Sequence, residues 1–134
     1  MKQRDILLAK YSLEKSDKAL DVAEKFMDID YQTAINKVYY AVFYMVLALG
    51  YLDRFTTGKH HQLMGWFNKK YIHQDKIFEV ELTKIYRKLI EDRETADYDV
   101  TCSFCKEHII ESLEKAKYFI SKVKPYLILK IAGE

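Results

Sequence analysis

The pattern of apolar positions centres on residues 36–50, the most apolar run in the chain. No charged residue occurs from Val38 to Leu52, and Lys37 and Asp53 bracket that stretch. Its length and its lack of internal glycine or proline favour a helix over a buried strand. It is shorter than the roughly 20 apolar residues that a membrane span requires. A helix that is apolar on nearly every face needs other helices around it, so this run predicts the centre of a bundle.

Segments on both sides of this run repeat apolar residues at intervals of three and four, which is typical of amphipathic helices. Further helices are expected over residues 3–27, 59–71, 76–92 and about 101–124. Breaks are expected at residues 52–58 and 71–75. Short connections favour antiparallel neighbours. The sequence therefore predicts an all-α fold, an antiparallel up-down helical bundle of four long helices plus one short helix, in a single domain over residues 1–134.

Particular residues are expected to mark the ends of these helices. Asp30 suits the N-cap of the central helix, and Gly50 suits the position just past its C-terminus. Asp99 or Thr101 could cap the last helix. Pro125 should kink or end that helix, because proline cannot donate the hydrogen bond of a helix interior.

The composition supports this fold and narrows the function. Hydrophobic residues make up 49% of the 134 residues and charged residues 31%, which is typical of a globular domain. One proline and four glycines leave little scope for the turns of a β fold. A net charge of +2 is too small to indicate nucleic-acid binding by itself. The first residues lack the apolar core of a signal peptide, so we expect a cytoplasmic protein without a membrane segment.

Two cysteines raise the question of a metal site, because His108 follows Cys102 and Cys105 closely. Both cysteines fall on the apolar stripe of the last predicted helix, and a second ligand pair at zinc spacing is missing. We therefore interpret them as buried structural thiols, and we expect neither a metal ion nor a cofactor.

Two features favour a polar site beside the central helix. The hydroxyl groups of its tyrosines, Tyr40 among them, need hydrogen-bond partners or water. Residues 54–76 combine basic and aromatic side chains, and Lys59, His60 and His61 are consecutive there. Basic groups can hold phosphates and aromatic rings can stack bases, which makes RNA or a nucleotide one candidate ligand. The alternative is an amphipathic helix with its rings in the core and its lysines in water.

Arg93 lies where the inner stripe of the fourth predicted helix would continue into a polar stretch, residues 94–99. A charged residue at such a position is costly unless it is paired, and Asp97 and Tyr98 are natural partners. Arginine beside an aspartate and a tyrosine can bind a phosphate or stabilise a developing charge. The alternative is a buried ion pair that fixes the turn between two helices.

Three segments, Asn36–Tyr44, Lys59–His61 and Arg93–Tyr98, together resemble a known family. They are similar, in order, to the N-R-x-Y-Y-A-x-F-Y helix, the K-x-H element and the R-x-x-A-D-Y signature of the small stand-alone prokaryotic HEPN domains. The resemblance implies an antiparallel helical bundle that usually forms a homodimer. It also implies a partner, a minimal nucleotidyltransferase, with the pair often acting as toxin and antitoxin.

Many HEPN proteins are metal-independent ribonucleases, with an arginine followed after four to six residues by a histidine. Here the corresponding positions are Tyr98, Asp99 and Val100, so the motif histidine is absent. An unperturbed tyrosine has a pKa near 10 and is a poor proton acceptor at neutral pH. His61 could supply the imidazole from the other segment.

The resemblance assigns roles to the candidate residues. Arg93 would neutralise a phosphate, Asp97 would orient Arg93, and Lys59, His61 and Tyr40 would contribute to binding or catalysis. Tyr98 would donate a hydrogen bond or accept a nucleotidyl group from the partner enzyme. Two alternatives are a non-catalytic nucleotide- or substrate-binding subunit of a nucleotidyltransferase complex and a plain dimeric helical scaffold.

Overall fold

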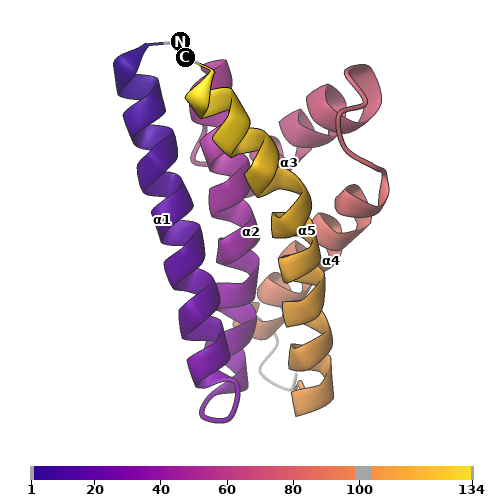
Figure 1. Ribbon diagram of the computed structural model, residues 1–134. Helices are drawn as coiled ribbons and strands as arrows, with labels where there is room; N and C mark the ends of the chain where they lie inside the picture. Colours follow the sequence, from indigo (N-terminus) through magenta and orange to yellow (C-terminus); the bar gives the residue numbers. More distant parts are fainter. Residues whose placement is uncertain (1, 99–103, 134) are drawn as a thin grey trace.

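The computed structural model describes residues 2–98 and 104–133, and these residues are helical except at their connections (Figure 1). The elements are α1 Gln3–Phe26, α2 Tyr31–Asp53, α3 His60–Phe67, the π-helix η1 Asn68–Gln74, α4 Glu81–Tyr98 and α5 Lys106–Ala132. In Figure 1, α1 and α2 lie side by side in opposite directions, and α5 ends near the start of the chain. The prediction of an all-α bundle with four long helices and one short helix is confirmed.

The predicted central helix, α2, forms the core of the bundle. It packs against α1, α3, α4 and α5. On α1, Ser12 and Ser16 donate hydrogen bonds to the carbonyl oxygens of Tyr44 and Ala41, each at 2.6 Å. These short side chains let the two helices approach closely, and they satisfy two polar groups that packing would otherwise leave buried and unpaired.

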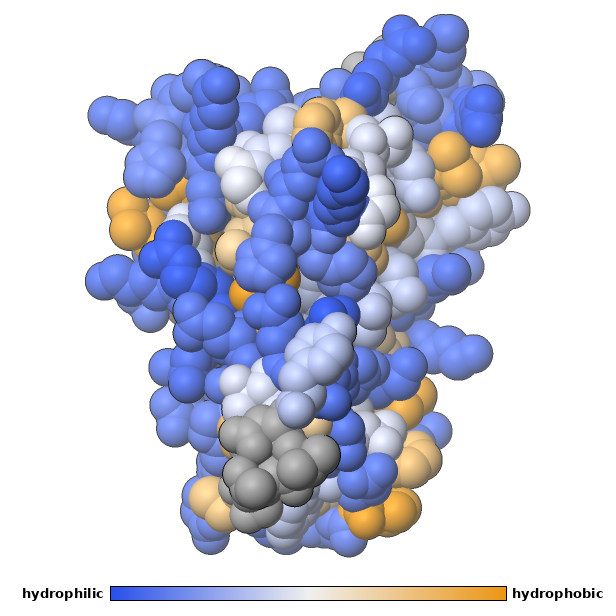
Figure 2. Space-filling view, turned by 180° about the vertical axis from the view of Figure 1, so that it is seen from behind, coloured by the Kyte–Doolittle hydropathy of each residue, from blue (hydrophilic) through white to orange (hydrophobic). Residues whose placement is uncertain are grey.

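Among the described helices, α2 alone is long and apolar enough to cross a membrane, but 67% of its most apolar window is buried inside the bundle. The surface seen from behind is largely hydrophilic, with apolar residues in scattered groups (Figure 2). Burial of this kind identifies α2 as the core helix of the bundle.

One end of α2 is as predicted and the other is not. Asp30 is the N-cap, and its side chain accepts a hydrogen bond from the backbone N–H of Gln32 at 3.2 Å. The prediction that the helix stops at Gly50 was wrong, because α2 continues to Asp53 and Arg54 takes the left-handed cap conformation at φ 62°. A Cβ at Gly50 would lie 2.5 Å from the carbonyl oxygen of Phe55. The glycine therefore permits a close approach of the returning chain.

The break predicted at residues 71–75 begins later than expected, at Asp75. The short helix α3 passes directly into η1, which continues to Gln74. Tyr71 and Ile72 are buried in this π-helix. Their burial explains why the chain stays coiled there despite the polar residues around them.

The fourth helix begins later and ends later than predicted. It was expected over residues 76–92, and α4 instead covers Glu81–Tyr98. The polar residues after Arg93 therefore extend the helix rather than forming a connection. Ala96 accounts for part of this extension, because it packs against the buried side chains of Ala34 and Ile35.

The last helix also extends beyond its predicted end. Pro125 does not terminate α5, which runs to Ala132. Leu127 is fully buried two residues beyond the proline. Lys130 Nζ lies 2.8 Å from Asp53 Oδ1 at the end of α2. These tertiary contacts beyond the proline thus offset the hydrogen bond that it removes.

The start of α5 changes the interpretation of Cys105. This residue is the N-cap of the helix and is exposed, so its prediction as a buried thiol was wrong. The stripe expected of it begins later, at Ile109. The remaining candidates lie outside the described residues: Cys102 and the proposed caps Asp99 and Thr101.

Candidate functional site

The candidate site forms where α4 crosses α2, and Arg93 is its centre. The Arg93 side chain is only 14% exposed. Its guanidinium carbon lies 5.1 Å from the ring centroid of Tyr39 and 5.9 Å from that of Tyr40. Nη1 donates a hydrogen bond to the Tyr40 hydroxyl oxygen at 3.3 Å. Two aromatic rings of the core helix therefore hold the cation in place.

His60, the first residue of α3, completes this site. Its Nδ1 lies 2.6 Å from the Tyr39 hydroxyl and 3.4 Å from Arg93 Nη1. Its ring stacks on Phe43 with a centroid distance of 4.5 Å. Burial of Tyr39 raises the pKa of its hydroxyl, so the hydroxyl keeps its proton and acts as the donor. Nδ1 is thus the acceptor of the imidazole, and Nε2 carries the proton.

The protonation of His60 follows from the same surroundings. Burial, and then the positive charge of Arg93, lower the pKa of His60 below its ordinary value. The imidazole is therefore neutral at pH 7. Because His60 is neutral, it does not repel the positive charge of Arg93 beside it.

A second pair of residues lies directly alongside the first. His61 Nε2 is 2.9 Å from Glu94 Oε2, so consecutive residues of α3 meet consecutive residues of α4. The His61 side chain is 61% exposed. With Nε2 directed at the carboxylate, Nδ1 of His61 is the nitrogen that can exchange a proton with a ligand.

Arg93 retains hydrogen-bonding capacity. Asp97 Oδ2 lies 3.8 Å from Arg93 Nε, which is close enough for an ion pair and too long for a hydrogen bond. Within the described residues, Nε is buried and lacks a hydrogen-bond partner. Buried donors are seldom left unpaired, so the described residues satisfy this guanidinium incompletely.

The predicted site residues meet only in part. Tyr40 and Asp97 contact Arg93. Lys59 is exposed directly before α3, and Tyr98 is 79% exposed at the end of α4. The described contacts of Arg93 include neither of these two residues. The roles given to the predicted residues stay predictions.

His60 is the residue that sequence reasoning missed. The K-x-H element predicted His61 as the site histidine, whereas His60 is the histidine that contacts α2. The choice depends on which residue begins α3, and an error of one residue turns a side chain by about 100° around a helix. The adjacent basic and aromatic residues were the available signal for this segment.

His108, once considered for a metal site, has a different partner. Its Nε2 lies 2.9 Å from Asp92 Oδ2, and Lys88 Nζ lies 3.1 Å from Asp92 Oδ1. Asp92 is 4% exposed. In the part of the chain that the structure describes, no group of three or more histidine, cysteine, aspartate or glutamate side chains could hold a metal ion.

Taken together, the fold and the site define a small all-α domain in which an arginine meets a histidine from another helix beside two aromatic rings of the core helix. The family model described as "HEPN domain" matches residues 9–126. The chain therefore belongs to the HEPN domain family, as the resemblance predicted.

Two relatives extend this result. The chain is 34% identical to the "Putative toxin MJ0142" of Methanocaldococcus jannaschii over 119 residues, which cover 88% of this chain and 80% of that protein. It is 32% identical to a "UPF0332 protein" of Thermotoga maritima over 92 residues, 69% of either chain. The chain is thus similar over most of its length to a protein named as a putative toxin.

Proposed function

We propose that this HEPN protein binds RNA through Arg93 and cleaves it without a metal ion. The observation that carries the proposal is the state of the Arg93 guanidinium, which is held over two rings and next to a neutral histidine. Its buried Nε has no hydrogen-bond partner among the residues that the structure describes. A guanidinium has five N–H donors in a planar fork that matches phosphate oxygens. Because Nε itself is buried, a phosphodiester would accept hydrogen bonds from the terminal nitrogens of the guanidinium.

The two histidines would act on opposite sides of the scissile phosphate. In metal-independent RNA cleavage the 2′-oxygen attacks phosphorus, its proton leaves to a base, and the 5′-oxygen departs with a proton from an acid. His61, oriented by Glu94 at 2.9 Å, offers Nδ1 as the base. Neutral His60 would donate a hydrogen bond from Nε2 to the departing 5′-oxygen, and a water molecule would supply the proton that this oxygen takes up. Arg93 would stabilise the charge that builds up on the phosphate oxygens. The products are a 2′,3′-cyclic phosphate and a 5′-hydroxyl.

The remaining candidates surround this centre. Asp97, paired with Arg93 at 3.8 Å, would orient the guanidinium. Lys59, exposed beside His60, and the hydroxyl of Tyr40 would contribute to phosphate binding. Tyr98 would donate a hydrogen bond to bound RNA.

Regulation by a partner is part of the proposal. HEPN toxins commonly pair with nucleotidyltransferase antitoxins, and a relative of this chain carries the name of a toxin. We expect a minimal nucleotidyltransferase as the partner, a homodimer as the assembly and the cytoplasm as the location. The high exposure of Tyr98 makes its hydroxyl accessible to nucleotidylation by that enzyme.

The test is incubation of the purified protein with cellular RNA in the presence of a metal chelator, beside Arg93→Ala and His61→Ala. Cleavage by the wild type that both variants lose is the expected result. Arg87→Ala and His73→Ala are matched controls, because both residues are exposed and lie outside the site. Equal cleavage by wild type and Arg93→Ala would contradict the proposal.

A second candidate function is RNA or nucleotide binding without cleavage, as a subunit of the nucleotidyltransferase complex. The observation that favours it is the tyrosine at the first position of the motif histidine, Tyr98, together with the lowered pKa of His60. In that case Arg93→Ala would abolish binding in the same assay, and the wild type would leave the RNA intact.

A further inference from the structure

Between Val38 and Leu52, the core helix α2 is partly exposed along one narrow line only. From Val38 to Leu52 every residue is buried except four, which are Tyr40, Tyr44, Leu47 and Tyr51. Their spacing of four, three and four residues places them on one face of the helix. Three of the four are tyrosines. We call these four residues the tyrosine line.

The tyrosine line starts at the candidate site and leads away from it. Tyr40 contacts Arg93, and the rings of Tyr40 and Tyr44 lie 5.7 Å apart. Eleven residues separate Tyr40 from Tyr51, which corresponds to roughly 16 Å along a helix. A strand that enters the site at Arg93 would therefore meet further aromatic rings along α2.

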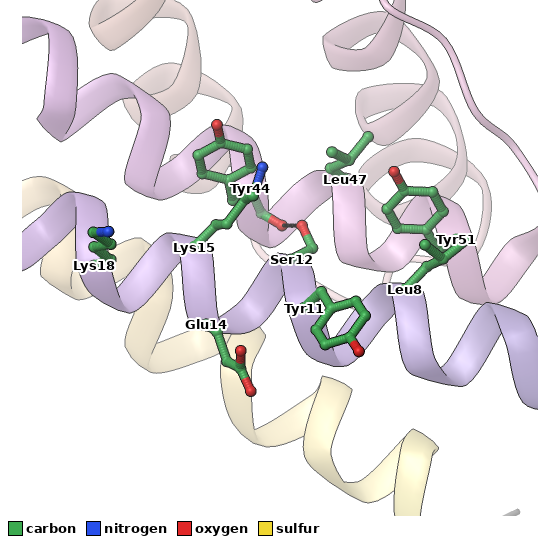
Figure 3. A pocket seen from close by; sticks show the side chains of 9 residues that line it. All are labelled: Leu8, Tyr11, Ser12, Glu14, Lys15, Lys18, Tyr44, Leu47 and Tyr51. Atoms are coloured by element: carbon green, nitrogen blue, oxygen red, sulfur yellow. Dashed lines mark hydrogen bonds between the residues drawn. The ribbon is translucent and has the colours of Figure 1, made fainter.

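A groove between α1 and α2 borders the tyrosine line (Figure 3). It occupies about 430 Å³. Its lining from α2 is Tyr44, Leu47 and Tyr51, and its lining from α1 includes Leu8, Tyr11, Lys15 and Lys18. In Figure 3 the rings of Tyr11 and Tyr51 stand on the two sides of this groove. The groove thus offers apolar and aromatic surface with amino groups beside it.

Each tyrosine of the line has a basic neighbour. Lys37 Nζ lies 6.0 Å from the ring centroid of Tyr40, and Lys15 Nζ lies 5.6 Å from that of Tyr44. Tyr51 shares an adjoining cavity with Arg4 and Arg54. Rings for bases and cations for phosphates, repeated along a groove, are the composition that binds single-stranded nucleic acid.

The charge of the groove favours single-stranded nucleic acid over a second copy of the chain as the molecule that binds there. Lys15, Lys18, Arg4 and Arg54 line the groove and its adjoining cavity, against the acidic Glu14 and Asp5. In a two-fold dimer through this face, the same positive surface would meet itself. Like charges across an interface are unfavourable, whereas an RNA strand brings the opposite charge.

We propose that the α1/α2 groove is the path by which single-stranded RNA extends from the Arg93 site, with Tyr44 and Tyr51 stacking bases and Lys15 and Lys18 contacting phosphates. This inference rests on the proposed function and adds to it the class of substrate. The substrate is an unpaired strand longer than the nucleotides at the scissile bond. At about 3.4 Å per stacked nucleotide, the line from Tyr40 to Tyr51 accommodates roughly five nucleotides.

The test compares the binding of two fluorescent probes, a 2′-deoxyuridine dinucleotide and its 12-mer, which lack the 2′-hydroxyl needed for cleavage. Tyr44→Leu combined with Tyr51→Leu should weaken binding of the 12-mer by about 30-fold and leave the dinucleotide unchanged. Lys15→Glu combined with Lys18→Glu should weaken the 12-mer and lower its salt slope by roughly 1.4. Arg93→Ala should weaken both probes.

The chain offers a matched control on α5, where Lys122 Nζ lies 5.3 Å from the ring centroid of Tyr118. Tyr118→Leu and Lys122→Glu remove the same chemistry outside the groove and should bind both probes as the wild type does. Thermal unfolding verifies that each variant is folded.

Three outcomes overturn the proposal. If the groove variants bind the 12-mer normally while Arg93→Ala weakens both probes, the path is wrong and the proposed function stands. If they change the molecular mass in light scattering and leave RNA affinity unchanged, the groove is a protein interface. If the wild type binds neither probe, the proposed function fails and the path fails with it.

Discussion

Asp92 and Arg93 are neighbours on α4, and each meets a histidine from another helix, yet the two pairs differ in how completely they are satisfied. Asp92 is buried between His108 at 2.9 Å and Lys88 at 3.1 Å. Arg93 has longer contacts, of 3.3 Å to Tyr40, 3.4 Å to His60 and 3.8 Å to Asp97. Its Nε has no partner among the described residues.

This difference distinguishes a structural pair from a binding site. A buried charge with short contacts on both oxygens contributes to stability, because removing it leaves its partners unpaired. A charge with long contacts and an unused donor contributes less to the fold and keeps its interactions for a ligand. We therefore expect mutations on the Asp92 side to change stability and mutations on the Arg93 side to change function.

The largest expected effect is that of Arg93→Ala on RNA cleavage. Removing the cation that stabilises the phosphate should lower the rate by about 10³-fold. The free energy of unfolding should change by less than about 1 kcal/mol. Cleavage rates in chelator and urea unfolding measure the two quantities. A large loss of stability with unchanged cleavage would show that Arg93 is a structural residue and not part of a binding site.

His61→Gln is expected to slow cleavage by about 10²-fold, because it removes the base and retains a side chain of similar shape. The matched change on the structural side, His108→Gln, should leave the rate within about twofold. Single-turnover kinetics at saturating RNA separates this effect from binding. Equal rates for the two variants would remove His61 from the mechanism.

Asp92→Ala should destabilise the fold by about 2 kcal/mol, because His108 and Lys88 lose their shared acceptor. Chemical denaturation of this variant beside the exposed Glu91→Ala measures the effect. RNA affinity should stay close to that of the wild type wherever the protein is folded. An affinity loss as large as that of Arg93→Ala would show that the two pairs act as one site.

The smallest expected effect is a pH dependence that comes from His60. Its pKa is lowered in the folded state, so below pH about 6.5 the unfolded chain binds more protons than the folded one. Stability should therefore be fully present above that pH and fall as the pH is lowered through it. His60→Gln should reduce this slope in thermal unfolding, and the exposed His73→Gln should not. The same slope in both variants would show that His60 titrates as it does in the unfolded chain.

The comparison also shows what the sequence could predict. The apolar run of residues 36–50 and the regular stripes around it were sufficient for the all-α bundle and its core helix. Arg93 was identified because it lies on the extension of an apolar stripe, where a charge is costly unless it is paired. These predictions depend on periodicity and composition, which a sequence displays directly.

The remainder depended on contacts between distant segments. The end of α2 is set by Phe55, whose carbonyl oxygen passes close to Gly50, and that approach leaves no local signal. The choice of His60 over His61 depends on the starting residue of α3. The partners of His108 and of the tyrosine line lie on other helices, so only the fold could reveal them.

The measurement that tests the central claim most directly is an NMR titration of the arginine Nε–H resonances with uridine 3′-monophosphate. If the Arg93 guanidinium is an open phosphate site, its Nε–H signal will shift and exchange more slowly with water as the nucleotide is added, while the exposed Arg87 stays constant. An Arg93 signal that does not move at saturating nucleotide would contradict the account, and it would leave Arg93 as a structural residue like Asp92.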